Sequence, residues 1–232
     1  MKLKLTKGKL SKEIAFSTSG TAPPIPKSIP ITPYKIFECS IDRAEHLLRI
    51  HEKAYGSNSE PSDAHRAAIV LAVAALDAFI RTLVIENIRT KIADQNQQVP
   101  PKLKEQAKGL LGLDGLFEAA RDGDLGSRLE KGFRQQFEEK SFQGINNIQE
   151  ALHLIGLENV FHTIADAAAI NEDHLKSDLG RFTKRRHIIA HCGDYDLTQT
   201  PPIEKNIEKD HAEKCIKVVR LVATEIQKLC KL

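Results

Sequence analysis

The segment RRHIIAHCGDYD groups side chains that could act on a phosphate. Arg186 and His191 are separated by four residues, and His187 follows the arginine directly. A guanidinium binds phosphate through charge-assisted hydrogen bonds, and an imidazole readily exchanges a proton near neutral pH. These residue types at this spacing indicate a site that grips a phosphate and moves protons beside it.

Helical periodicity relates these side chains to the core. At about 100° per residue, Arg186 projects from the middle of the apolar face of the predicted helix, whereas His187 and His191 share a flanking face. A buried guanidinium needs a carboxylate or an anionic ligand. Arg185 also fits the spacing, with five residues before His191. Because the helical wheel turns Arg185 toward the rim, Arg186 is preferred and Arg185 remains the alternative.

The same helix is locally basic. Between residues 176 and 187, five basic residues stand against one acid, Asp178, which gives a local charge of +4. Such a run is either a solvated helix face or a set of phosphate contacts, and Arg181, Lys184 and Arg185 are the candidates for those contacts. The formal charge of the chain, +3, includes five lysines that precede Glu13, so the remainder carries −2 and gives no general indication of nucleic acid.

A second charged residue follows the most apolar stretch of the chain. AAIVLAVAAL is apolar on every face and predicts a central helix over about 62–90, and Asp77 comes directly after it. A carboxylate there needs a cation or hydrogen-bond donors. Either Asp77 pairs with Arg81 one turn later, or it meets Arg186 and fixes its direction; the second interpretation is slightly favoured.

The remaining pattern predicts an all-α fold around one bundle core. Residues 1–36 form a basic, Pro-rich arm, either disordered or touching phosphates, and residues 37–232 form the helical domain. We expect a first helix over about 40–55, short helices among the glycines after Pro101, two helices or one bent at Gly156, a helix over 173–191, and a last helix from about Asp210. The low aromatic content, 5% with no Trp, disfavours a β-sandwich.

Other functional classes find little support in the sequence. The longest apolar run has ten residues, about half of what a bilayer-spanning helix needs, so no membrane partner is expected. Without an apolar leader or a C-x-x-C pair, the four cysteines indicate a reduced, cytoplasmic compartment. A zinc site at His187, His191 and Cys192 is weighed and disfavoured, because structural zinc normally uses paired ligands from two segments.

The sequence resembles the HEPN superfamily of helical domains. Its R-x(4-6)-H signature is matched by Arg186 to His191, with His187 at the polar second position. HRAAIVLAVAALDAFIRTLV is similar to the long second helix of prokaryotic members, and KSFQGINNIQEALHLIGL resembles the stand-alone RiboL-PSP branch. The resemblance covers about residues 36–232 and implies a helical bundle with a long central helix and inserted short helices or loops.

The resemblance also implies a function. Many HEPN proteins are metal-independent ribonucleases of toxin–antitoxin or antiviral defence systems, in which an RNA 2′-OH attacks the adjacent phosphate. By this resemblance Arg186 and His191 would be catalytic, with His187 and Asp77 supporting them, no cofactor, and a site completed in a homodimer. Alternatively, the domain binds RNA, nucleotide or a partner protein such as an antitoxin without catalysis. Tyr195 would then be a candidate acceptor of modification, unless it merely packs in a loop.

Overall fold

The computed structural model describes residues 32–56, 63–94 and 96–230. These residues form eight helices and one short β-hairpin, which confirms the predicted all-α class. In chain order the elements are α1 (Pro33–Tyr55), α2 (Asp63–Ala93), α3 (Pro101–Asp122), α4 (Leu125–Glu138), α5 (Ile145–Leu154), α6 (Val160–Ala167), α7 (Glu172–Cys192), β1 (Tyr195–Asp196), β2 (Ile203–Glu204) and α8 (Lys209–Cys230).

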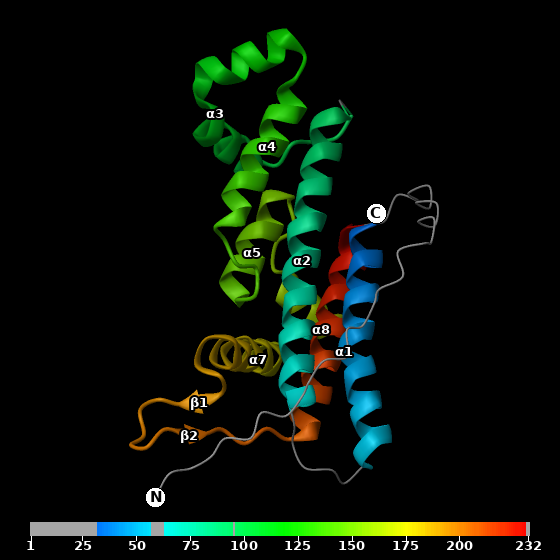
Figure 1. The fold of residues 1–232 in the computed structure, drawn as a ribbon. Coiled ribbons are helices and arrows are strands. Elements are labelled where there is room, and N and C mark those ends of the chain that lie inside the picture. Colours follow the sequence, from blue (N-terminus) through cyan, green and yellow to red (C-terminus); the bar gives the residue numbers. More distant parts are fainter. Residues whose placement is uncertain (1–31, 57–62, 95, 231–232) are drawn as a thin grey trace, which may run out of the picture. The chain divides into compact units, whose positions relative to one another are not determined.

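The central element is α2, which packs against α1 along its length and against α8, α7, α4 and α5 (Figure 1). Its buried residues run from His65 to Ile88 and include Leu76, Phe79 and Ile80, all fully enclosed. Among the described helices, α2 alone has the length and hydropathy of a membrane span, but 61% of its most apolar window is buried inside the protein. Burial by neighbouring helices explains why α2 is apolar on every face.

The first helix begins earlier than its period predicted. Thr32 caps it by accepting a hydrogen bond from the Lys35 amide, and Pro33 occupies the first turn, where its missing N–H costs nothing. Residues 33–36, which were assigned to the arm, are therefore helical. The rest of the arm, residues 1–31, lies outside the described residues.

The glycine-rich region forms α3 to α6. A left-handed φ of 68° at Gly112 breaks α3 into two pieces, in agreement with the short helices predicted for this region. The alternative at Gly156 is also decided, because α5 and α6 are separate helices on either side of it. Gly156 has a φ of 87°, a conformation that favours glycine.

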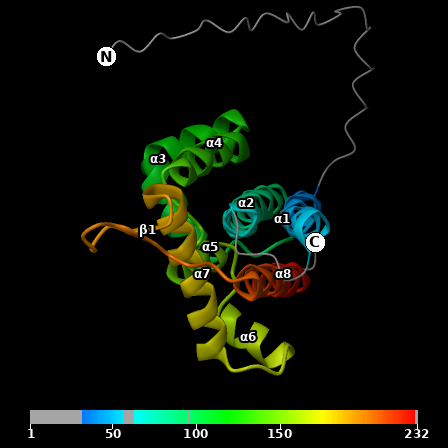
Figure 2. The same cartoon turned by 60° about the horizontal axis from the view of Figure 1, so that its bottom comes forward.

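The predicted motif helix is α7, which contacts α2, α6 and α8. Figure 1 views α7 nearly along its axis while α1, α2 and α8 run upright, so α7 crosses the central helices steeply. Figure 2 shows the β1–β2 hairpin at the motif end of α7. The strands pair Tyr195 with Glu204 and Asp196 with Ile203, and two residues per strand are too few for an alternation to be visible in the sequence.

Candidate active site on the motif helix

The two histidines of the motif lie one turn apart on the exposed side of α7. His187 and His191 are both exposed, and their ring centroids are 4.4 Å apart with an interplanar angle of 43°. This is the shared face that helical periodicity predicted. Both imidazoles can therefore reach a ligand that approaches the last turns of α7.

Arg186 lies beside them, partly buried and without a protein partner among the described residues. Its Nε–H is enclosed and donates to no acceptor, and the guanidinium forms no hydrogen bond or ion pair within that part of the chain. Leaving a buried charged donor unpaired costs free energy. An anionic group placed against α7 would meet this unmet requirement.

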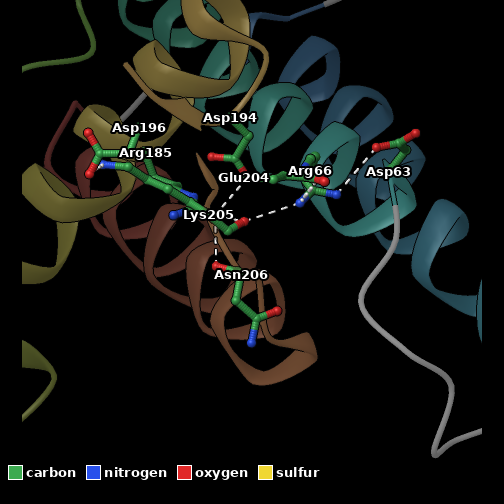
Figure 3. Close-up of polar contacts among 8 residues, drawn as sticks. All are labelled: Asp63, Arg66, Arg185, Asp194, Asp196, Glu204, Lys205 and Asn206. Atoms are coloured by element: carbon green, nitrogen blue, oxygen red, sulfur yellow. Dashed lines mark hydrogen bonds and ion pairs between the residues drawn. The ribbon is translucent and has the colours of Figure 1, made fainter. Parts of the chain in front are cut away.

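Arg185 is held by the protein instead. One of its terminal nitrogens lies 2.6 Å from Asp194 Oδ2 and donates to the backbone carbonyls of Lys205, at 3.2 Å, and Asn206, at 2.9 Å (Figure 3). These contacts fix the guanidinium on the linker before α8. The expectation that Arg185 is turned toward the rim was wrong, because its side chain is only 16% exposed and reaches the buried Asp194. The two arginines that the spacing left open therefore differ in their contacts: the terminal nitrogen of Arg185 is bound by the protein, whereas Arg186 has no such contact among the described residues.

The carboxylate that holds Arg185 was not predicted. Asp194 is completely buried and also accepts a hydrogen bond of 2.8 Å from Arg66 Nε, on the first turns of α2. Arg66 further pairs with Glu204 at 2.7 Å and with the exposed Asp63 at 3.4 Å. The sequence signal that could have pointed to Asp194 is its position directly after Gly193, where the chain leaves α7.

Asp77 has a different partner from the one favoured by the sequence. It accepts a hydrogen bond from the Phe142 amide and lies 3.7 Å from Arg81, while Arg81 donates to the carbonyls of Phe137 and Lys140. Among the described residues no contact joins Asp77 to Arg186, so that expectation was wrong. Asp77 fastens the α4–α5 linker to α2, because packing brings that linker, rather than α7, to this turn of α2.

The basic residues of α7 are used unequally. Arg181 pairs with Asp178 at 2.8 Å, and its guanidinium carbon lies 5.5 Å from the centroid of the Phe182 ring. Lys214 of α8 shares the same Asp178 at 2.7 Å. Lys184 is exposed and forms no ion pair within the described chain. Lys184 is therefore the freest of the three predicted phosphate contacts.

Tyr195 lies in β1, immediately after the motif helix. Its side chain is 43% exposed, and its hydroxyl has no hydrogen bond to the described residues. The ring is therefore accessible from solvent, whereas its proposed role as an acceptor of modification stays a prediction.

The cysteines and histidines do not converge. Within residues 32–56, 63–94 and 96–230, no group of three or more His, Cys, Asp or Glu side chains has the arrangement of a metal site. All four cysteines are free, and burial raises the pKa of the Cys215 thiol to about 12.

The comparison with protein-family models gives a match. The family model RiboL-PSP-HEPN matches residues 38–232, which include every helix from α2 to α8 and most of α1. Neither the curated proteins nor the solved structures gave a match. The matched region contains Arg186, His187 and His191 at the spacing described above, on a helical bundle. The chain therefore belongs to the RiboL-PSP-HEPN family.

Proposed function

We propose that this protein is a metal-independent endoribonuclease of the toxin or defence type. The observation that carries the proposal is Arg186, a partly buried guanidinium with an enclosed Nε and no protein partner among the described residues, beside two exposed imidazoles. RNA supplies both the phosphate that such a guanidinium binds and the 2′-OH that can attack it. We place this activity in the cytoplasm.

The proposed reaction begins with removal of a proton from the 2′-OH. Its oxygen then attacks the adjacent phosphorus, and the bond to the 5′-oxygen breaks as that oxygen receives a proton. His191 acts as the base or the acid, and Arg186 stabilises the charge of the phosphorane. His187 orients the phosphate, and Lys184 extends the contact along the backbone. The products are a 2′,3′-cyclic phosphate and a 5′-OH.

One motif supplies too few proton-transferring groups if His187 only orients. We therefore propose that two chains bring their motifs together across a two-fold axis, so that His191 of each copy serves the other's reaction. Light scattering should give the mass of two chains at micromolar concentration. A mass of one chain in an active preparation would refute the composite site.

The test is cleavage of mixed RNA in chelator by the wild type and His191→Ala. His174→Ala is a matched control, because His174 is an exposed histidine at the other end of the same helix. We expect the wild type and the control to give cyclic-phosphate ends and to leave DNA intact, and His191→Ala to be inactive. Loss of activity in chelator with recovery in Mg²⁺, or equal cutting of DNA, would contradict the mechanism.

The exposed Tyr195 hydroxyl favours a second candidate, a binding subunit that a partner enzyme modifies beside the motif. A well-folded dimer that cuts no RNA but still binds it through Arg186 would support this role in place of catalysis.

A further inference from the structure

A buried ionic cluster lies directly beneath the motif and is absent from the mechanism above. Asp194 Oδ2 receives Arg66 Nε at 2.8 Å and an Arg185 terminal nitrogen at 2.6 Å, and Figure 3 shows the carboxylate between them. The side chains of Asp194, Arg66 and Arg185 are 0%, 13% and 16% exposed. The cluster therefore joins the start of α2, the motif helix and the segment that follows it in a nearly dry environment.

The backbone at Asp194 is fastened as well. Gly193 and Asp194 both have left-handed φ angles, 58° and 68°, and both amides donate to the carbonyl of Ile188. The carbonyl of Asp194 accepts a hydrogen bond of 2.8 Å from the Lys205 amide. Because His191 lies between Ile188 and Gly193 in this closed turn, the position of its backbone depends on where Asp194 is held.

The Asp194 carboxylate neutralises Arg185. Arg66 also has Glu204, but the only carboxylate that Arg185 contacts among the described residues is Asp194. Without that carboxylate, Arg185 would be a second unneutralised guanidinium next to Arg186, and a phosphate could bind to either. Neutralising Arg185 therefore leaves one guanidinium to define the place of the phosphate.

We propose that Asp194 is a positioning residue of the nuclease site: it holds Arg185 away from the substrate and fixes the last turn of α7, so that Arg186 and His191 meet the same phosphate. This inference rests on the proposed ribonuclease function. Arg66 supports the arrangement by holding Asp194 from α2.

The sharpest test is Asp194→Asn. Asparagine has the same shape and tolerates the left-handed conformation well, so the substitution removes the charge while keeping the turn. Asp42→Asn is the matched control, because Asp42 pairs with Arg220 on the exposed surface between α1 and α8. Arg66→Lys is a second variant, which keeps the charge but loses the forked geometry.

Two readouts separate positioning from mere stability. The first is kcat and KM for an RNA oligonucleotide, measured well below the midpoint of thermal unfolding. We expect Asp194→Asn to lower kcat on the order of 10- to 100-fold with a small change in KM, because a displacement of about 1 Å is enough for such a loss. Arg66→Lys should lower kcat by a few-fold, and Asp42→Asn should match the wild type.

The second readout is the NMR spectrum of the His187 and His191 imidazoles, whose ring contact reports the geometry of the last turn. We expect these resonances to move in Asp194→Asn and to stay in place in Asp42→Asn. Unchanged resonances together with an unchanged kcat in folded Asp194→Asn would overturn the proposal. If the wild type cuts no RNA, the proposed function fails. The His187 and His191 resonances of Asp194→Asn still test the positioning role in that case: a change supports it, and no change contradicts it.

Discussion

Glutamine substitutions at the adjacent Arg185 and Arg186 should affect different properties of the protein, one mainly its stability and the other mainly its activity. Arg185 and Arg186 have the same side chain, follow each other on α7 and are both partly buried. Arg185 is held by Asp194 and two carbonyls, whereas Arg186 is held by nothing among the described residues. We expect Arg185→Gln to reduce stability more than activity, and Arg186→Gln to reduce activity and leave stability nearly unchanged.

The contacts give the size of the difference. Removing one partner of a buried ion pair costs about 3 to 5 kcal/mol, because the other charge stays buried and unpaired. Asp194 would keep Arg66 at 2.8 Å, so the cost of Arg185→Gln should fall near or below the lower end, about 2 to 3 kcal/mol. Arg186→Gln breaks no contact and relieves an unpaired donor, so its free energy of unfolding should stay within about 1 kcal/mol of the wild type.

The assay is thermal or urea unfolding followed by circular dichroism, in parallel with RNA cleavage. For a domain of about 200 residues, 1 kcal/mol corresponds to about 2 to 4 °C in Tm, so Arg185→Gln should lower Tm by about 4 to 12 °C. For Arg186→Gln we expect a shift of less than about 4 °C and a loss of cleavage of about 100-fold or more, the scale of losing a group that stabilises transition-state charge.

Equal destabilisation by the two substitutions would refute the reasoning, because it would mean that Arg186 has a protein partner of comparable strength. Wild-type stability of Arg185→Gln would also refute it, because the burial of the Asp194 carboxylate would then not depend on its pairing with Arg185. Lys184→Gln serves as the control on the same helix, because Lys184 is exposed and should change neither Tm nor the fold.

Three further predictions concern other parts of the chain. Burial, followed by the positive charge of nearby Arg181, lowers the pKa of His211 in the folded protein. The unfolded chain therefore binds a proton at this histidine at higher pH than the folded chain does, and the free energy of unfolding should fall as the pH drops below about 6.5. In urea titrations from about pH 7.5 to 5.5, His211→Gln should flatten this dependence on pH. Since burial raises the pKa of Cys215 to about 12, peptide mass spectrometry should find this thiol unlabelled by a thiol reagent at pH 8 until the protein is unfolded. Asp77→Asn and Arg186→Gln should be additive in stability within about 0.5 kcal/mol, and a larger coupling would restore the contact that the structure lacks.

The sequence was sufficient to predict features that depend on neighbouring residues along one helix. The local residue pattern placed both ends of α7 and the start of α8 within one residue and turned Arg186 toward the core, because these features follow from residue types and spacing along one helix. The start of α1 was missed by seven residues, since Pro33 reads as a loop residue although it is well suited to a first helical turn.

The sequence was insufficient where partners come from distant segments. Periodicity indicated that Asp77 needs a donor but could not say which, and packing supplied the Phe142 amide, 65 residues away. The pairing of Arg66 with Asp194 spans 128 residues and depends on how α7 crosses α2. A buried ionic cluster of this kind becomes visible only when the tertiary contacts are known.

The turn formed by Gly193 and Asp194 sets a limit on chain length in the motif. Asp194 reaches back nine residues to Arg185, and each helical residue adds about 100° of rotation and 1.5 Å of rise. One residue inserted between His187 and His191 would swing Asp194 about 100° away from Arg185, whereas a substitution at the exposed Ala190 would leave the register intact. This segment should therefore tolerate changes of residue type far better than changes of length, and a relative with a longer motif must fasten its last turn by other contacts.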